Sequence, residues 1–394
     1  MSIAKKIEKI IAGSSWIRKM FEEGTRLKAE HGAENVFDFS LGNPNQEPPE
    51  EFFKALRAEI DAKGPMRHAY MPNPGYPEVR RAVADYLSTE YAVDLTEGDI
   101  IMTCGAAGAL NVALKTILDP GDEVITPAPY FVEYGAYASN HGGILKTAKT
   151  RPDFTLDIDA IAGAVTEKTK AVLINSPNNP TGQIYSEGSL KALGALLSEK
   201  GRALNRTIYL ISDEPYRKIV YDGLQVPSFF SCYKESILAT SYSKDLSIPG
   251  ERIGFAAVHP EATYRKEIAG GMTLANRILG FVNAPGLMQR VVGAIQGVGV
   301  DVSAYARKRA LICSGLSDCG YEFVQPPGAF YLFPKSPIPD DVEFVKLLQE
   351  ELILAVPGSG FGGPGHFRLA FCVDDNTIVN AMPGFRRVID KIKS

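Results

Sequence analysis

The sequence has no apolar segment long enough to cross a membrane, since a spanning helix needs about 20 predominantly apolar residues. Its charges nearly cancel, because 42 Lys and Arg face 46 Asp and Glu, which gives a net charge of −4 over 394 residues. Such a balance offers no global attraction to nucleic acid or to an anionic membrane surface. Residues 1–32 mix isoleucines with frequent charges, which indicates an amphipathic helix rather than a secretory signal peptide.

Cysteine and histidine are both scarce, with five of each. The cysteines show no Cys-x-x-Cys spacing, and the histidines lack the paired spacing of metal ligands, so neither a disulfide framework nor a metal site is expected. A reducing cytoplasm is the predicted location. GxxxxGK[ST] and GxSxG are also absent, which leaves a P-loop nucleotidase and a hydrolase nucleophile elbow without support. A formal GxGxxG at 358–363 precedes proline and a strand pattern instead of a helix, so it predicts a loop.

Short apolar runs that alternate with helical patterns fill residues 100–260. Runs this continuously apolar suit strands that are buried on both faces. They are DIIMT at 99–103, EVIT at 123–126, AVLIN at 171–175, IYLIS at 208–212, ILATS at 237–241 and GFAAV at 254–258. Between the third and fourth runs, leucines at helical spacing predict a helix over 186–201. This order predicts an α/β domain with a doubly wound, mostly parallel sheet.

The pattern changes after about residue 290. Residues 291–320 read as one long helix, and strand-like AFYLF at 329–333 and FRLAF at 367–371 follow. We expect a smaller α+β domain here, completed by the N-terminal segment. The predicted division is 1–45 for that segment, 46–288 for the large domain and 289–394 for the small domain.

Three of the buried runs end in polar side chains of reactive types. They are Asn179 after AVLIN, Asp213 and Tyr216 after IYLIS, and Lys244 after ILATS. Taken singly, each is better explained as a turn residue, a helix cap or a solvated charge. Ligands of parallel sheets bind beyond the carboxyl ends of the strands, so the joint placement favours one shared site.

Lys244 and Asp213 together point to a particular cofactor. A lysine in a partly dehydrated crevice can become neutral and condense with a carbonyl, while an aspartate suits a protonated ring nitrogen. Pyridoxal 5′-phosphate carries both an aldehyde and a pyridine ring, and it uses a lysine Schiff base with an acidic partner. Its phosphate needs a cradle, for which the candidates are CGAAG at 104–108, opening a helix, and Ser241 with Arg252.

The segment SYSKDLSIPGERIG at 241–254 resembles the lysine signature of class I pyridoxal-phosphate aminotransferases, of the aspartate aminotransferase superfamily. The resemblance continues in chain order over nearly the whole sequence, which makes it specific. The further matching segments are SLGNPN at 40–45, YMPNPGYPEVRRAVADYL at 70–87, TCGAAGALNVAL at 103–114, LDPGDEVITPAPYF at 118–131, NSPNNPTG at 175–182, SDEPY at 212–216 and a terminal strand with Arg368.

The resemblance implies roles around the cofactor ring. Lys244 would hold the cofactor as a Schiff base and then move the proton at the substrate Cα. Asp213 would keep the ring nitrogen protonated, and Phe131 would stack on the ring. Asn179 and Tyr216 would hydrogen-bond the ring hydroxyl oxygen.

The resemblance also implies the phosphate ligands. Ala106, Ala107, Ser241 and Arg252 would bind the phosphate, joined by Tyr70 from a partner subunit. A homodimer is therefore expected.

For the substrate, the resemblance implies that Arg368 clamps the α-carboxylate, helped by Asn179 and the backbone of Gly42. The expected protein is a transferase of fold type I in cytoplasmic amino-acid metabolism, with a biosynthetic role. It would pass an amino group from an L-amino acid to a 2-oxo acid in two stages. Neither nucleic acid, membrane nor metal is an expected partner.

Two departures from the family pattern concern substrate preference. Relatives specific for dicarboxylates place an extra cation near the substrate side chain, and the matching position is Ile278, with Arg277 one residue away. Another subgroup has lysine at the position of Ala107. Both departures argue against strict aspartate or glutamate specificity, although Arg277 keeps the question open.

Two rival classes share the scaffold. C–S lyases and cyclopropane-carboxylate synthases bind the same cofactor with the same motifs, so the sequence discriminates poorly against them. Transcriptional regulators with aminotransferase-like domains carry an added DNA-binding domain, which is not expected here.

Overall fold

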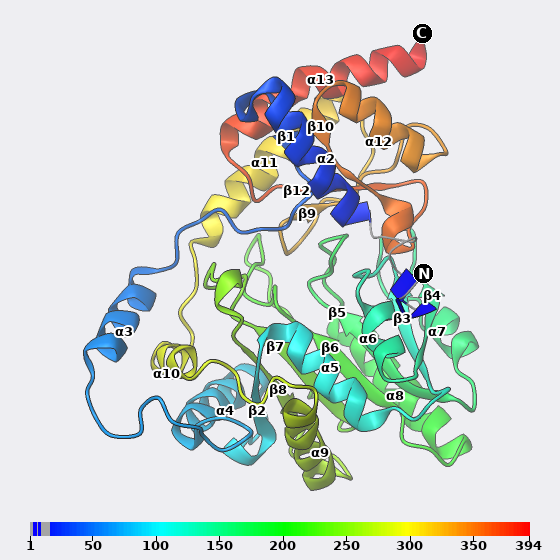
Figure 1. The fold of residues 1–394 in the computed structure, drawn as a ribbon. Helices are drawn as coiled ribbons and strands as arrows, with labels where there is room; N and C mark the ends of the chain where they lie inside the picture. Colours follow the sequence, from blue (N-terminus) through cyan, green and yellow to red (C-terminus); the bar gives the residue numbers. More distant parts are fainter. Residues whose placement is uncertain (1–2, 6, 9–15) are drawn as a thin grey trace.

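A seven-stranded sheet occupies the lower part of the computed structural model, which describes residues 3–5, 7–8 and 16–394 (Figure 1). In spatial order its strands are β2 (Ile100–Thr103), β8 (Gly254–Val258), β7 (Ser236–Ser241), β6 (Tyr209–Asp213), β5 (Thr169–Asn175), β3 (Glu123–Ala128) and β4 (Ile144–Lys149). β8 runs antiparallel to both neighbours, whereas the remaining pairings are parallel. The six predicted strands and the mostly parallel sheet are confirmed.

Within this seven-stranded sheet, β4 is the strand that the sequence pattern missed. It lies at the edge of the sheet, and most of its side chains are partly or fully exposed. An edge strand needs no continuous apolar run, so the pattern that identified the buried strands does not mark it.

Helices cover both faces of the sheet, as the doubly wound prediction requires. Side chains of α4 (Pro77–Tyr91), α8 (Glu187–Ala203) and α10 (Gly286–Ala294) pack on one face. Those of α5 (Gly105–Ile117), α6 (Tyr134–Asn140) and α9 (Arg265–Ile278) pack on the other. Successive strand residues alternate between these two clusters, because side chains of a strand point to opposite faces. The further helices of this unit are α3 (Glu50–Asp61), α7 (Ile158–Ala164) and the 3-10 turns η2 (Glu97–Asp99) and η3 (Pro249–Glu251).

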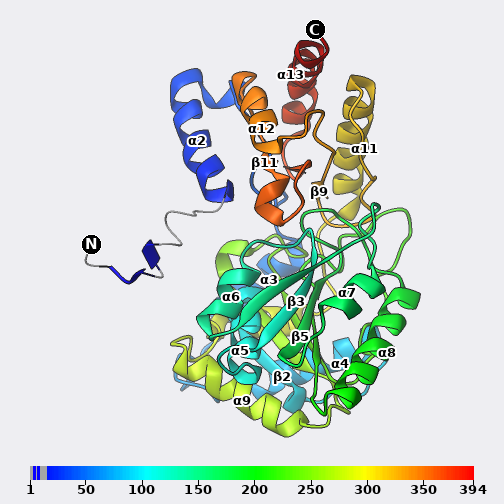
Figure 2. The same cartoon turned by 90° about the vertical axis from the view of Figure 1, so that its right-hand side faces the viewer.

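A separate hydrophobic cluster forms the core of the upper unit, which we call the small domain (Figure 2). Its strands are β9 (Tyr331–Leu332), β11 (Val356–Pro357) and β12 (Phe367–Ala370) in one antiparallel sheet, and β1 (Phe37–Asp38) beside β10 (Ile353–Leu354). Its helices are α2 (Trp16–His31), α11 (Val302–Cys319), α12 (Asp341–Glu350), α13 (Asp375–Lys393) and the 3-10 turns η1 (Ala33–Asn35) and η4 (Gly358–Phe361). The glycine-rich stretch 358–363 forms η4 and the turn before β12, so no dinucleotide turn is built there.

The N-terminal segment joins this small domain, because Met20 and Phe39 are buried in its cluster. Part of the amphipathic helix expected over residues 1–32 is seen as α2, while residues 9–15 lie outside the described part. Among the described residues, no helix combines the length and apolar character that a bilayer crossing requires.

The single helix predicted over 291–320 is wrong. α10 ends at Ala294 and α11 begins at Val302, with Gly297 at φ +85° between them and Asp301 capping α11 through its side chain. Val292 of α10 packs in the cluster of the large domain, whereas Val302 packs against the small-domain cluster. We therefore place the boundary near residue 299 instead of 288.

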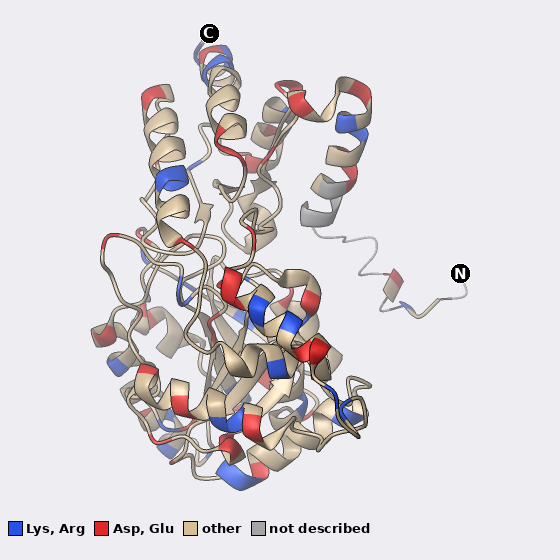
Figure 3. Cartoon of the chain, turned by 90° about the vertical axis from the view of Figure 1, so that its left-hand side faces the viewer, with Lys and Arg blue, Asp and Glu red and all other residues tan. Residues whose placement is uncertain are grey.

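The near-zero net charge is visible on the surface. Figure 3 shows basic and acidic residues mixed along the helices of one side of the molecule. Such mixing gives no single-signed face for a polyanion.

Candidate active site

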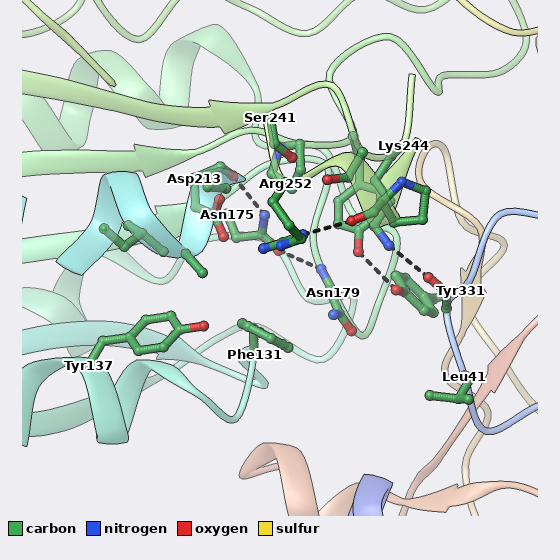
Figure 4. Close-up of a pocket in the computed structure, with 18 of the residues that line it drawn as sticks. Leu41, Phe131, Tyr137, Asn175, Asn179, Asp213, Ser241, Lys244, Arg252 and Tyr331 are labelled. Atoms are coloured by element: carbon green, nitrogen blue, oxygen red, sulfur yellow. Dashed lines mark hydrogen bonds between the residues drawn. The ribbon is translucent and has the colours of Figure 1, made fainter. Parts of the chain in front are cut away.

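A cavity of about 330 Å³ lies at the carboxyl ends of β5, β6 and β7, below the small domain (Figure 4). All of the predicted site residues except Tyr70 line it. The large domain contributes residues that follow its strands, and the small domain contributes Arg368 from β12 and Tyr331 from β9. The cavity is therefore closed by both domains.

The amine of Lys244 lies inside this cavity. Its Nζ donates a hydrogen bond to the carbonyl oxygen of Gly42 at 2.8 Å. Burial lowers the pKa of Lys244 to about 8, and the nearby Arg368 and Arg252 guanidinium groups act in the same direction. No carboxylate within the described chain forms an ion pair with it. Lys244 is thus neutral in part near physiological pH, far more than an ordinary lysine, and a nucleophilic or basic amine needs this neutral form.

Asp213, the last residue of β6, presents a carboxylate that is only half satisfied. Its Oδ2 accepts a hydrogen bond from the Tyr134 hydroxyl at 2.6 Å, whereas its buried Oδ1 has no partner among the described residues. Burial raises the pKa of Asp213 to about 7, although the Tyr134 hydrogen bond opposes this. A buried carboxylate oxygen without a partner is costly, so this atom suits a cationic donor in the cavity.

Asn175 and Asn179 hold the floor of the site. The Asn175 side chain donates to the backbone oxygen of Asp213 at 2.7 Å and accepts from the backbone N–H of Asn179 at 2.6 Å. The sequence prediction included Asn179 but not Asn175, which sits in the same NSPNNPTG segment. Together these bonds lock the ends of β5 and β6 in register at the cavity.

Arg368 carries a buried guanidinium on the small-domain side. It donates to Asn179 Oδ1 at 3.1 Å and to the Ser40 carbonyl at 2.5 Å, and it lies over the rings of Tyr331 and Phe361. Burial lowers its pKa, and none of the described carboxylates pairs with it. A buried guanidinium without a carboxylate partner can hold a ligand carboxylate with two parallel hydrogen bonds.

Arg252 and the start of α5 form a second anion site. Arg252 donates to the Pro249 carbonyl at 2.9 Å, and Ala106, Ala107 and Ser241 also line this part of the cavity. Gly105 is required here, since its φ is +73° and a Cβ would lie 3.0 Å from the Arg252 Nη2 atom. The free N–H groups of a helix N-terminus beside a guanidinium suit a phosphate.

Tyr216 and Tyr331 are joined across the domain boundary. Their hydroxyls form a hydrogen bond of 2.8 Å, and a Cβ on Gly42 would overlap the Tyr331 hydroxyl. The sequence prediction included Tyr216 and missed Tyr331, Tyr134 and Tyr137, all of which contact Asp213, Tyr216 or the cavity. Because tyrosine is common in this chain, these three positions carry no sequence signal of their own.

Two groups of predicted residues lie elsewhere. Tyr70 is 94% exposed and lines a surface groove with residues 281–284, outside the cavity of its own chain. Arg277 and Ile278 are exposed on α9 and do not line the cavity either. Phe131 does line it, and its ring packs edge-on against Tyr134.

Pyridoxal phosphate fits the donors that the cavity presents. The orphaned Asp213 oxygen suits the protonated ring nitrogen, Lys244 suits the aldehyde carbon, and the Arg252 region suits the phosphate. Arg368 is left over for the carboxylate of a substrate.

Comparison with known proteins identifies the family of this chain. The sequence profile of the family described as aminotransferase class I and II matches residues 34–383. A probable aspartate aminotransferase of Methanocaldococcus jannaschii is 30% identical over 365 residues, covering 90% of this chain and 94% of that protein. An aromatic-amino-acid aminotransferase 2 of Thermococcus litoralis is 30% identical over 407 residues, covering 100% of both.

Solved structures agree in fold over almost the full length. A crystal structure of an aminotransferase from Eubacterium rectale superposes with a TM-score of 0.97 at 37% identity, covering 100% of both chains. Aspartate aminotransferase of Thermus thermophilus with maleate superposes with a TM-score of 0.87 at 27% identity, covering 98% of this chain and 100% of that one.

Proposed function

Since the chain belongs to the class I and II aminotransferases, we propose that the cavity around Lys244 is its active site. The protein is a pyridoxal-phosphate-dependent amino-acid aminotransferase with the fold-type-I architecture. One observation carries the assignment of the site. A neutralisable amine, a carboxylate oxygen without a partner and an unpaired guanidinium meet in one cavity at the strand ends.

Each of these groups has a distinct task. Bound pyridoxal phosphate supplies an aldehyde for the amino group and a ring that accepts electrons when the Cα–H bond breaks. Asp213 holds the proton at the ring nitrogen, and the Tyr216 hydroxyl with the Asn179 amide orients the ring oxygen. The Lys244 amine, with a pKa of about 8, would take the proton from the substrate Cα and deliver it to the carbon that came from the cofactor aldehyde.

Arg368 binds the group that the two successive substrates have in common. The donor amino acid and the acceptor 2-oxo acid share an α-carboxylate, and Arg368 binds that group in both. Because the anchor binds the group that the two substrates share, it serves both half-reactions.

A half-reaction screen tests this function. We expect the holoenzyme, mixed with a single L-amino acid and no oxo acid, to lose its visible cofactor absorption and to release the matching 2-oxo acid. The amount released should not exceed one equivalent per site. Release of ammonia, pyruvate or a cleaved side chain would instead assign the protein to the lyase group.

Arg368→Leu should raise KM for every amino acid and oxo acid alike. Loss of a charge-assisted carboxylate pair costs about 1.5–3 kcal/mol per hydrogen bond, so we expect an increase of about 100-fold or more. Steady-state kinetics with donors of different side chains measures this. The matched control is Arg202→Leu on the exposed surface of α8, which should leave KM unchanged. An effect confined to one substrate would contradict the role of Arg368 as the common anchor.

We propose that the enzyme accepts donors without a second carboxylate. Among the described residues that line the cavity, the cations are Lys244, Arg252 and Arg368, all of which have other tasks. Leu41 and Phe131 add apolar lining. The relatives named above are called aspartate and aromatic-amino-acid aminotransferases, so phenylalanine against aspartate is the informative pair in the screen.

We propose a homodimer in which Tyr70 completes the phosphate site of the partner subunit. Tyr70 and Met66 are largely exposed, and Val282, which lines the same surface groove as Tyr70, is 37% exposed. Large exposed apolar side chains that gather in one region are typical of interaction sites.

Tyr70→Phe should weaken cofactor binding while the dimer persists. One lost hydrogen bond to a charged phosphate predicts an increase of the cofactor Kd by about tenfold or more. Equilibrium dialysis measures the Kd, and sedimentation velocity measures the assembly. Tyr264→Phe, also on an exposed tyrosine, is the control. A monomer that binds the cofactor as tightly as the wild type would contradict both parts of the proposal.

The five cysteines all carry free thiols. This supports a reducing compartment, and we propose cytoplasmic amino-acid biosynthesis as the setting.

A further inference from the structure

The chain crosses between the two domains twice, and both crossings touch the loop that carries Lys244. We call residues 40–46 the first crossing, residues 295–301 the second crossing and residues 242–247 the lysine loop. Figure 1 shows the crossings as the blue and yellow segments that join the upper and lower units. In the first crossing, the Gly42 carbonyl accepts from Lys244 Nζ at 2.8 Å and the Gln46 carbonyl accepts from Ser247 Oγ at 2.6 Å.

The second crossing is bound to the same loop. The backbone N–H of Val300 donates to the Asp245 carbonyl at 2.7 Å, and the Gln296 side chain donates to the Tyr242 hydroxyl at 2.8 Å. The crossings are also joined to each other, because the Gln46 side chain donates to the Asp301 carbonyl at 3.0 Å. Any displacement of the small domain would therefore be transmitted to the lysine loop through the hydrogen bonds of both crossings.

One ammonium group ties these elements together. Lys218 Nζ lies 3.2 Å from the Asp245 Oδ2 atom and donates to the Val298 carbonyl at 3.1 Å. Lys218 follows Tyr216 by two positions, so the ion pair also links the segment after β6 to the residue next to Lys244. Its ammonium lies over the ring of Tyr86, and both partners of the pair are largely buried.

Among the described residues, Lys218 is the cation that forms an ion pair with Asp245. The second carboxylate oxygen of Asp245 is buried without a partner within the described chain, so Lys218 is the cation that compensates this carboxylate. Burial raises the pKa of the Asp245 carboxyl, and the Lys218 ammonium opposes that shift. Removing Lys218 would leave the Asp245 carboxylate buried and unpaired, which is relieved when the carboxyl takes up a proton or the loop moves toward water.

We propose that the Lys218–Asp245 ion pair positions Lys244 by coupling the lysine loop to the second crossing. The small domain carries Arg368, which we assign to the substrate carboxylate, and the large domain carries Lys244, which we assign to the Cα proton. The pair keeps these two halves of the site aligned. Lys218 and Asp245 touch neither substrate nor cofactor, so both are positioning residues. This inference rests on the proposed function of Lys244 and Arg368.

The test compares Lys218→Met, Asp245→Asn and the double variant as holoenzymes. We expect the single-turnover rate with a good donor to fall at least about tenfold in each, because small misplacements of a reacting group are costly. The dissociation constant of the donor should stay within about twofold, since Arg368 is untouched. The double variant should be no slower than the slower single variant, because both remove one interaction.

A readout independent of activity is amide hydrogen exchange. Peptides from 242–247 and from 295–301 should exchange at least about tenfold faster in Lys218→Met, with or without cofactor. Lys308→Met is the matched control, because Lys308 forms a comparable partly buried pair with Asp375 inside the small domain. That variant should keep the wild-type rate and the wild-type exchange of both segments. Lys218→Arg retains the cation and should restore part of the rate. If Lys218→Met does not fold, Asp245→Asn, which breaks the same pair, replaces it in the exchange measurement.

Specific results would overturn the coupling. A Lys218→Met enzyme that is less stable but has the wild-type single-turnover rate and unchanged exchange in both segments would make the pair merely structural. Additive losses in the double variant would do the same. If the wild type itself does not transaminate, the proposed function fails, and the exchange data alone still decide whether the pair couples the two segments.

Discussion

Lys244→Ala is expected to abolish multiple turnover. The substitution removes both the amine that bonds to the cofactor aldehyde and the base that moves the Cα proton. A positioned general base alone contributes about 10²–10⁴-fold, so the loss of both tasks should exceed about 10⁴-fold. Stopped-flow absorption of the half-reaction, with the released oxo acid quantified, measures this loss.

The same variant tests where the cofactor is attached. After reduction with borohydride, mass spectrometry of the wild type should find the added cofactor mass on the peptide that contains Lys244. In Lys244→Ala no peptide should carry it. Lys308→Ala, at a paired lysine of the small domain, should behave as the wild type. Retained multiple turnover in Lys244→Ala would reject the assignment.

Asp213→Asn is expected to slow removal of the Cα proton by orders of magnitude. The asparagine keeps the shape but cannot hold a proton at the ring nitrogen by charge. Breaking a buried ionic interaction costs about 3–5 kcal/mol, which corresponds to about 10²- to 10⁴-fold in rate. Single-turnover kinetics with a deuterated Cα–H bond isolates this step, and a near-wild-type rate would contradict the role. Asp213→Glu, which keeps the charge, should lose less.

The thermal stability of cofactor-free Asp213→Asn shows whether its slow reaction comes from the lost charge or from misfolding. Burial raises the pKa of Asp213 to about 7 in the folded chain, above its value of about 4 in the unfolded chain. The folded state therefore holds an extra proton between these values, and the stability of the wild type should fall as the pH rises from about 4 to about 7. Cofactor-free Asp213→Asn lacks that contribution and should gain thermal stability relative to the wild type at pH 8. The drop in thermal midpoint from pH 5 to pH 8 should be smaller in Asp213→Asn than in the wild type. Equal drops in the two proteins would show that ionisation of the Asp213 carboxyl does not cause the loss of stability.

Much of the fold was predictable from the sequence, since buried parallel strands are continuously apolar. The six runs that predicted β2, β3, β5, β6, β7 and β8 need only composition and length to be recognised. The ordered motifs identified the family, the cofactor and the aminotransferase reaction, and all three are confirmed. The helix predicted over 186–201 from leucine spacing is confirmed as α8 (Glu187–Ala203).

The two errors have different causes. The edge strand β4 tolerates polar residues, so the continuously apolar pattern does not mark it. The break between α10 and α11 carries a signal in the sequence, Gly297 and the capping Asp301, whereas which domain covers each helix is set by tertiary packing.

The residue types of the site were likewise set by the sequence alone: an amine, a carboxylate, an amide and a guanidinium at strand ends. Only the tertiary structure determined their protonation and their hydrogen-bond or ion-pair partners. The orphaned oxygen of Asp213, the partly neutral amine of Lys244 and the unpaired Arg368 arise from burial, which depends on long-range packing. The Tyr216–Tyr331 bond and the Lys218–Asp245 pair join residues more than 25 positions apart, and local pattern carries no information at that separation.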